Sequence, residues 1–231
     1  MTAAATRSNA GVSDAPPFAP RLDVLTPPQR RLWDELGDVP DGFTLYGGTG
    51  PALHLGHRQS VDFDFFGDRR FDPADLLDEL PFGSDAEVTL QQADTLSVRV
   101  DRGGLVALSF FGVPEIGRVR APLSAGGAVA SALDIAGMKA CVVTRRADVK
   151  DYRDIAALLR GGVSLPEVLA AGRVIDGSRF VPEIALRARS FYGDGDVARL
   201  PAADRGVIAA AVAADPRALP DLRPVRPRRD R

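Results

Sequence analysis

The segment FTLYGGTGPALHLGHRQSVDFDFF restricts the fold of this chain more than any other. FTLYGGTG predicts a buried strand that runs into a glycine turn, PALHLGH predicts a short helix, and VDFDFF predicts a second strand. Apolar and acidic residues alternate strictly in VDFDFF, so Val61, Phe63 and Phe65 are expected on one face of that strand. Asp62 and Asp64 then project from the other face. A strand, a glycine turn, a short helix and a strand therefore open the fold.

The rest of the chain divides into a strand-rich part and a helical part. Thr26 is expected to cap a helix that continues through QRRLWDEL, and AEVTLQQ, TLSVRVD and LVALSFF predict strands. From Ser131 onward, apolar residues recur at the three- and four-residue spacing of helices. We therefore expect an α+β fold, with a mixed sheet over residues 21–121, a link APLSAGGAVA, and helices over 131–214 that pack on the sheet.

Both ends of the chain lack the apolar residues of a core. Residues 1–20 are small, polar and proline-rich, without the apolar segment of a signal peptide, and predict a disordered leader. Residues 215–231, DPRALPDLRPVRPRRDR, are rich in arginine and proline and predict a solvated, disordered tail. The alternative is an arm that touches RNA.

The composition limits the cellular compartments and the binding partners to be expected for this protein. The 29 basic and 31 acidic residues give a formal charge of −2, so no global positive field attracts nucleic acid or an anionic membrane. A single cysteine, Cys141, excludes intramolecular disulfides and cysteine zinc sites. The apolar run at 207–214 is far shorter than the about 20 residues of a membrane helix. We expect a cytoplasmic protein that does not associate with membranes.

The acid pair and the glycine turn form the strongest candidate site. Asp62 and Asp64 project from one strand face about 7 Å apart, and two such anions repel each other and resist burial. A divalent cation resolves this conflict, and Mg²⁺ prefers one or two carboxylates plus phosphate oxygens and waters. Gly47 and Gly48 let the backbone approach a triphosphate, and the Thr49 hydroxyl offers a donor. The alternative is a solvent-facing strand edge with a plain turn.

Lysine usage indicates a second candidate site. Only two of the 29 basic residues are lysines, Lys139 and Lys150. Lys139 shares a helix stripe with Ile135, Val142 and Val143, so it is expected among buried residues. A buried ammonium needs an anion nearby, and a nucleotide phosphate or an aspartate would serve. The alternative is a lysine whose ammonium reaches solvent along an apolar stem.

The pair His54-Leu-Gly-His57 permits a rival interpretation. HxGH is the phosphate-binding signature of one nucleotidylyltransferase superfamily and of class I tRNA synthetases. There the motif begins a helix and a lysine- and serine-rich loop follows far downstream, whereas here it ends a helix and no such loop occurs. We therefore expect His54 to pack in the interior, and His57, Arg58 and Ser60 to lie beside a nucleotide pocket.

Two segments together resemble a known family. GGTGPALHLGHRQSVDFDFF is similar to the Gly-Gly/Ser and Asp-x-Asp signature of polymerase β-type nucleotidyltransferases, in the form carried by AbiEii-type toxin nucleotidyltransferases. DIAGMKACVVTRRADVKDYRDIAALL is similar to that family's lysine-containing helix and closing Asp-x-x-Asp helix, here Lys139 with Arg145, then Asp151 with Asp154. The resemblance covers roughly residues 43–190 and implies a polymerase β-like nucleotidyltransferase fold followed by a helical half.

The resemblance also implies a set of site residues. The expected catalytic residues are Asp62, Asp64, Lys139 and Asp154, and Asp62 and Asp64 also hold the metal. The expected nucleotide-binding residues are Gly47, Gly48, Thr49, Arg58, Ser60 and Asp151. Asp151 has a simpler alternative role, as the acidic partner of its own helix N-terminus.

The implied function is Mg²⁺-dependent transfer of a nucleotide from an NTP to an RNA, for which a tRNA end is one candidate, or to a protein. A cognate antitoxin is an expected partner. One departure from the family concerns a third carboxylate, which such enzymes usually carry on a later strand, whereas LVALSFF offers Ser109 and no acid. Asp62 and Asp64 then hold the metals alone, or Asp151 or Asp154 takes part. The remaining alternative is a weakened, nucleotide-binding regulatory module.

Overall fold

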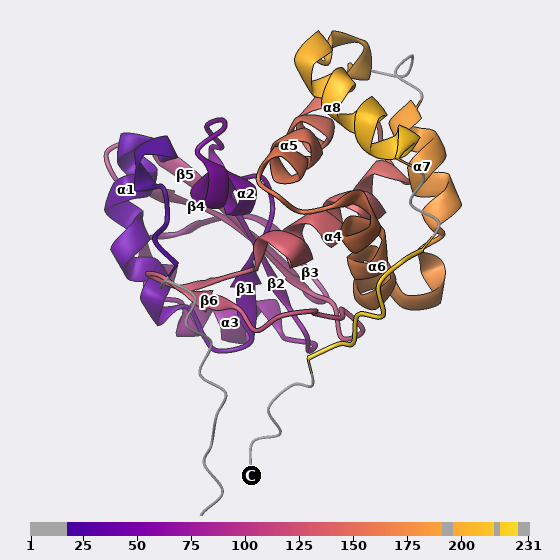
Figure 1. Ribbon diagram of the computed structural model, residues 1–231. Helices are drawn as coiled ribbons and strands as arrows, with labels where there is room; N and C mark the ends of the chain where they lie inside the picture. The colour runs from indigo at the N-terminus through magenta and orange to yellow at the C-terminus, as the bar shows by residue number, and fades with distance from the viewer. Residues whose placement is uncertain (1–17, 191–195, 215–217, 226–231) are drawn as a thin grey trace, which may run out of the picture.

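A mixed sheet and a set of helices make up the two halves of this computed structural model, which describes residues 18–190, 196–214 and 218–225. Figure 1 shows α1 and α3 on one side of the strands and the later helices on the other, with α2 between them. The strands are β1 (Phe43–Leu45), β2 (Asp62–Gly67), β3 (Glu87–Gln92), β4 (Thr95–Asp101), β5 (Leu105–Gly112), β6 (Leu123–Ser124) and β7 (Ala128–Val129). The α-helices are α1 (Pro27–Leu32), α2 (Thr49–Leu55), α3 (Pro73–Glu79), α4 (Ala132–Val143), α5 (Val149–Arg160), α6 (Leu165–Asp176), α7 (Pro182–Ser190) and α8 (Ala202–Ala213). The predicted α+β class, with a mixed sheet and then a helical half, is confirmed.

The sheet has seven strands in the order β3-β4-β5-β2-β1-β7-β6. β2 runs parallel to β5, and β1 runs parallel to β7, while the other neighbours are antiparallel. The acid-bearing strand β2 therefore lies in the interior of the sheet, between β5 and β1. This position fixes the backbone of Asp62 and Asp64 on both sides.

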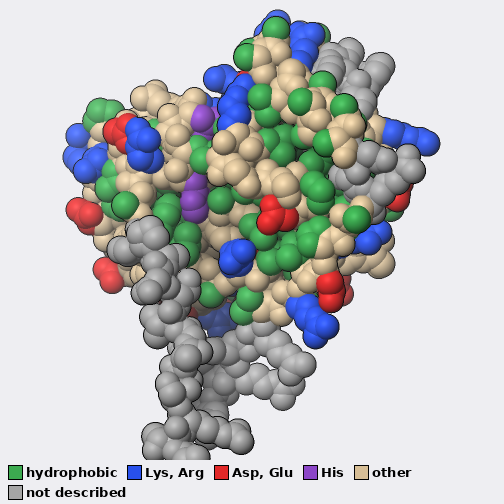
Figure 2. All heavy atoms as spheres, in the orientation of Figure 1, with side chains coloured by type: hydrophobic (Ala, Val, Ile, Leu, Met, Phe, Trp, Pro, Cys, Tyr) green, Lys and Arg blue, Asp and Glu red, His purple; other side chains and the backbone are tan. Residues whose placement is uncertain are grey.

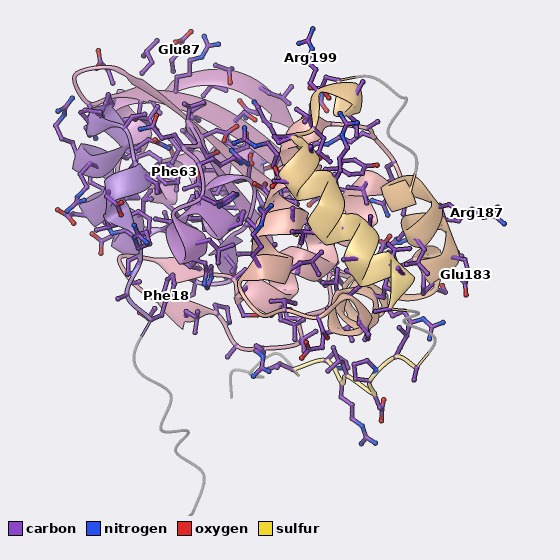
Figure 3. All side chains as sticks on the ribbon, turned by 45° about the horizontal axis from the view of Figure 1, so that its top comes forward. Phe18, Phe63, Glu87, Glu183, Arg187 and Arg199 are labelled. Atoms are coloured by element: carbon purple, nitrogen blue, oxygen red, sulfur yellow. The ribbon has the colours of Figure 1, made fainter. Side chains whose placement is uncertain are left out.

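One face of the sheet packs against α1, α3 and the 3₁₀ turn Trp33–Asp38. Thr26 caps α1 as predicted, in a capping box with Gln29. The rings of Trp33 and Phe63 lie 6.3 Å apart, and Phe63 points into this core in Figure 3. Phe63 and Phe65 are both buried, on one face as the alternation predicts, whereas Val61 precedes β2, so it is not part of the strand, and is 66% exposed.

The opposite face of β1 and β2 is covered by α4, which in turn packs on α6. A Cβ at Gly137 would lie only 2.7 Å from the Cβ of Ala171, so the absence of a side chain there lets the two helices approach closely. Asp134, near the start of α4, accepts hydrogen bonds from the backbone N–H groups of Val119 and Arg120. These hydrogen bonds attach the start of α4 to the loop over 113–122.

The segment expected to be a simple link between the two halves forms part of the sheet. Within residues 121–130 the chain forms the short strands β6 and β7, and Leu45 pairs with Val129. The backbone N–H of Ala130 then donates to the carbonyl of Leu45 at 3.0 Å, one residue before α4 is capped by Ser131. The sheet therefore extends to the start of the helical half.

Most of the expected leader and part of the expected tail lie outside the described residues. Of residues 1–20, only 18–20 are described, and the ring of Phe18 lies 4.5 Å from that of His54. Of residues 215–231, the segment 218–225 is described, and its Leu219 packs partly buried against the helical core. The division into leader, sheet core, helical region and tail stays a prediction. No helix among the described residues is long and apolar enough to cross a bilayer.

Candidate active site

A cleft of about 640 Å³ lies between the sheet and α4. Its walls include eight of the ten predicted site residues, namely Gly47, Gly48, Arg58, Ser60, Asp62, Asp64, Lys139 and Asp151. Of the predicted site residues, Thr49 and Asp154 do not line the cleft. The structure thus brings together residues from β2, α4, α5 and the turns around α2.

The two carboxylates of β2 lie on the cleft side of the sheet. Ser60 Oγ donates to Asp62 Oδ1 at 3.0 Å, and the Thr49 hydroxyl donates to the backbone carbonyl of Asp62. Burial and the neighbouring charge of Asp62 raise the pKa of Asp64 to about 6, against the opposing charges of Lys139 and Arg146. The acid pair therefore stores a repulsion that a cation would relieve.

The donor set around this pair fits a hard divalent cation. Two carboxylates converge here, and among the described residues no cluster of three or more His, Cys, Asp or Glu side chains is suited to a metal. A cation such as Mg²⁺ accepts this arrangement, because it takes its other ligands from phosphate oxygens and water. The residues are thus suited to a cation that binds together with a substrate.

The glycine turn lies directly against the acid pair. Gly47 has φ +51°, and a Cβ there would lie 2.2 Å from Asp64 Oδ2 and 2.8 Å from Asp64 Cβ. A Cβ at Gly48 would lie 2.7 Å from both Arg58 Nη2 and Ser60 Oγ. The backbone of this turn can therefore approach Asp64, Arg58 and Ser60 this closely only because neither glycine has a side chain.

We expect Gly47→Ala to displace the Asp64 carboxylate and to strain the turn, since alanine disfavours positive φ by about 1 kcal/mol. The affinity for an NTP with Mg²⁺ should fall at least about tenfold, and isothermal titration calorimetry would measure it. Gly162→Ala is a matched control, because Gly162 also has a positive φ but nothing lies within 4 Å of a Cβ there. Equal affinities for Gly47→Ala and the wild type would contradict the expected role of the turn.

Lys139 is buried between two aspartates of α5. Its side chain is 7% exposed, and Nζ lies 2.9 Å from Asp151 Oδ1 and 2.8 Å from Asp154 Oδ2. Burial opposes the charge of Lys139, but Asp154 and Asp151 outweigh that effect and raise its pKa. The alternative of an ammonium that reaches solvent is therefore wrong. Arg146 Nε also donates to Asp151 at 2.9 Å, so Asp151 does more than face its own helix N-terminus.

Asp154 has a fully buried carboxylate that contacts three basic side chains. Arg58 donates through Nε at 2.6 Å and through Nη2 at 2.8 Å, His57 Nε2 lies at 2.8 Å, and Lys139 completes the set. Burial alone would raise the pKa of Asp154, but the hydrogen bonds from His57 and Arg58 and the charge of Lys139 lower it far below its usual range. This network joins α5 and α4 to the loop before β2.

The two histidines lie along the boundary between the halves of the molecule (Figure 2). His54 packs as predicted, with Nε2 2.9 Å from the carbonyl oxygen of Ala130, and burial lowers its pKa. Because His57 is bound to Asp154, it lies beside the cleft without lining it. The two rings are thus directed to different parts of the protein, and the HxGH alternative gains no support.

Several residues of the cleft wall were not predicted from the sequence as part of the site. They form an apolar region and a group of charged side chains at the mouth of the cleft. The rings of Phe66 and Phe111 lie 5.1 Å apart at the apolar end, where Met138 is also part of the wall. The strand alternation in LVALSFF offered a signal, because Phe111 falls on the same face as Ser109. At the mouth lie Arg146 and Asp148, which were not named from the sequence, and Arg145 and Lys150, which were named but not assigned to the site.

The residue beside Asp64 on β5 is Ser109, from the strand on which the resemblance leads one to expect a third carboxylate. Asp64 pairs across the parallel ladder with Ser109, whose hydroxyl lies 3.1 Å from that of Ser97 on β4. The acids of α5 are both bound to Lys139, and only Asp151 of the two reaches the cleft. The carboxylates on the sheet side of the cleft are therefore Asp62 and Asp64.

Comparison with known proteins gives relatives of two kinds. A protein of Aquifex aeolicus, aq_aa25, is 33% identical over 122 residues, which make up 51% of this chain and 58% of that protein. The match thus spans less than two thirds of this relative's length. JHP933 from Helicobacter pylori has a similar structure, with a TM-score of 0.48 and 15% identity over 80% of this chain and 92% of that one. The Megavirus polyadenylate synthase is similar with a TM-score of 0.40 and 16% identity, over 56% of this chain and 31% of that one.

The family match covers most of the chain. Residues 31–223 match the family described as the nucleotidyl transferase AbiEii toxin of type IV toxin–antitoxin systems. This range contains the glycine turn, the acid pair, Lys139 and the Asp-x-x-Asp helix. The chain therefore belongs to the AbiEii nucleotidyl transferase toxin family.

Proposed function

We propose that this protein is a Mg²⁺-dependent nucleotidyltransferase that transfers a nucleotide from an NTP to a hydroxyl acceptor. The observation that carries the proposal is the convergence of the acid pair, the glycine turn and a buried lysine on one cleft. In the reaction, the acceptor oxygen forms a bond to the α-phosphorus, and the bond from that phosphorus to the bridging oxygen of the β-phosphate breaks. Pyrophosphate leaves, and the hydroxyl proton passes to water.

Asp62 and Asp64 would hold the metal. When bound, such an ion neutralises phosphate charge and lowers the pKa of the attacking hydroxyl. Ser60 and Thr49 hold the strand segment of Asp62 in place, which gives Thr49 a positioning role in addition to any contact with the nucleotide. Lys139 and the remaining donors of Arg58 supply fixed positive charge next to the transferred group.

The composition of the cleft suggests how the nucleotide lies. Phe66, Phe111 and Met138 offer flat or adaptable apolar surface for a base, whereas arginines and lysines elsewhere in the wall offer positive charge for phosphates. The α-phosphate would then lie between them, beside the acid pair. Asp154 holds Arg58 and Lys139 from behind, so we propose that it positions these two cations for catalysis.

Lys139→Arg is expected to lower the transfer rate about a hundredfold, although it keeps the charge. A compact ammonium fits between Asp151 and Asp154 at 7% exposure, whereas the longer planar guanidinium would have to displace one of them. Single-turnover kinetics at saturating NTP would measure this loss. A wild-type rate would mean that only the charge at position 139 matters.

The acceptor is proposed to be an RNA, with a tRNA end as the first candidate and a protein as the second. To test this, purified protein would be incubated with each labelled NTP, Mg²⁺ and total cellular RNA, beside the Asp62→Asn/Asp64→Asn double variant. Label in RNA from the wild type alone would support the proposal, and label in protein alone would change the acceptor. We also propose a cytoplasmic location and a cognate antitoxin, in keeping with the family.

Ser109 supports a second candidate function. With a serine at the position of the third carboxylate, the cleft could bind a nucleotide and turn it over slowly or not at all. Such a protein would act as a nucleotide-binding regulatory module. NTP binding by calorimetry without label in any acceptor would favour this function, whereas absence of NTP binding would contradict both.

A further inference from the structure

Lys150 is an exposed cation at the mouth of the cleft, in the second position of α5. Its backbone N–H donates to Asp148 Oδ1 at 2.8 Å. No carboxylate of the described ranges lies within 4 Å of its ammonium, although the cleft walls contain both acidic and basic side chains. The charge of Lys150 is thus available to a ligand.

The other cations of the cleft are already bound to carboxylates. Arg58 binds Asp154, Arg146 binds Asp151, and Lys139 lies between these two aspartates. Arg145 pairs with Asp176 of α6, away from the acid pair. Lys150 therefore differs from its neighbours, because an incoming anion would not have to compete with a carboxylate for it.

The residue type at position 150 is a second observation. The chain uses arginine for 27 of its 29 basic residues, and both of its lysines line this cleft. A lysine provides a compact charge on a flexible stem, which suits a mobile phosphate chain better than a planar guanidinium does.

We infer that Lys150 binds the terminal phosphates of the NTP, and that Arg146 is the second cation of this subsite. Arg146 uses Nε for Asp151, which leaves its two terminal nitrogens available at the mouth. Both side chains line the same cleft as the acid pair, so this subsite would hold the group that leaves as pyrophosphate. This inference rests on the proposed function, since it names a contact of the same nucleotide.

The test compares ligands with and without the terminal phosphates. Calorimetry with Mg²⁺ would measure the affinity of the full chain for an NTP, the matching NMP and inorganic tripolyphosphate. The variants are Lys150→Gln, Lys150→Glu and the control Arg187→Gln, because Arg187 is an exposed cation on the outer side of α7 (Figure 3). Lys150 is exposed, so these substitutions leave the core unchanged, and melting temperatures would verify folding.

For Lys150→Gln we expect about tenfold weaker binding of the NTP and of tripolyphosphate, and about a hundredfold for Lys150→Glu. NMP binding should stay unchanged in both, and the loss for the NTP should shrink in 0.5–1 M salt, where exposed charges are screened to about 3 Å. Equal NTP affinity of Lys150→Gln and the wild type would overturn the inference while leaving the proposed function intact. A loss of NMP binding as large as that of NTP would also overturn it. A wild-type protein that binds no NTP would overturn both.

Discussion

Asp62→Asn or Asp64→Asn should reduce nucleotide transfer at least about a thousandfold, because each removes half of the charge that would hold the metal. The same changes should leave the metal-free protein as stable as the wild type or more stable. Burial and the charge of Asp62 raise the pKa of Asp64 to about 6, whereas an aspartate in the unfolded chain has its pKa near 4. Above pH 6 the folded wild-type protein must therefore keep a carboxylate charged in an unfavourable environment, and asparagine avoids this.

The sign of the stability effect follows from that raised pKa. The gain from Asp64→Asn should be fully present above pH 6 and should disappear below about pH 4, where Asp64 is protonated in both states. Thermal melts of metal-free protein at pH 7.5 and pH 4 would measure it. Mg²⁺ with an NTP should raise the melting temperature of the wild type and not of the variants. Undiminished Mg²⁺-dependent transfer by the double variant would exclude the acid pair as the metal site.

Asp154→Asn should lower the free energy of unfolding by about 3 kcal/mol, since it leaves the charges of Lys139 and Arg58 without their shared buried counter-charge. Its pKa lies far below the usual range in the folded protein, so its ionisation stabilises the fold at all pH values above about 4. This stabilisation is lost as the pH falls further toward the folded-state pKa. The difference between the wild type and Asp154→Asn should thus be smaller at pH 3 than at pH 5.

Urea unfolding at both pH values would measure this difference. Asp204→Asn is a suitable control, because Asp204 pairs with the half-exposed Arg160 alone and its loss should amount to less than about 1 kcal/mol. A loss for Asp154→Asn no larger than for this control would mean that the network does not hold the two halves together. A difference that grows toward pH 3 would contradict the low pKa of Asp154.

The acid pair was predictable because its signal is local. Strict alternation in VDFDFF fixes the faces of Phe63 and Asp64 without any knowledge of the rest of the chain. The burial of Lys139 was predictable for the same reason, from the apolar residues of its own helix turn. The place of Val61 outside the strand was not predicted. Strand β2 begins one residue later, and alternation does not specify where a strand starts.

The partners across the cleft were not predictable from spacing. Arg58 and Asp154 are separated by 96 positions, and their bidentate contact depends on how α5 packs against the loop before β2. The strands β6 and β7 contain two residues each, too few for any period to be visible. Lys150 and Phe111 reach the same cleft from a helix start and a strand end, so only the packed structure reveals their relation.

The three-residue strand β1 pairs with the strand that carries the acid pair and with the strand that precedes the helix of Lys139. Leu45 pairs with Phe65, next to Asp64, on one side, and with Val129, just before α4, on the other. The separation between the acid pair and Lys139 is thus set by two adjacent ladders, although positions 64 and 139 are 75 positions apart in the chain. The loop over 113–122 could therefore gain or lose residues in related proteins without altering that separation, provided the chain re-enters the sheet beside β1.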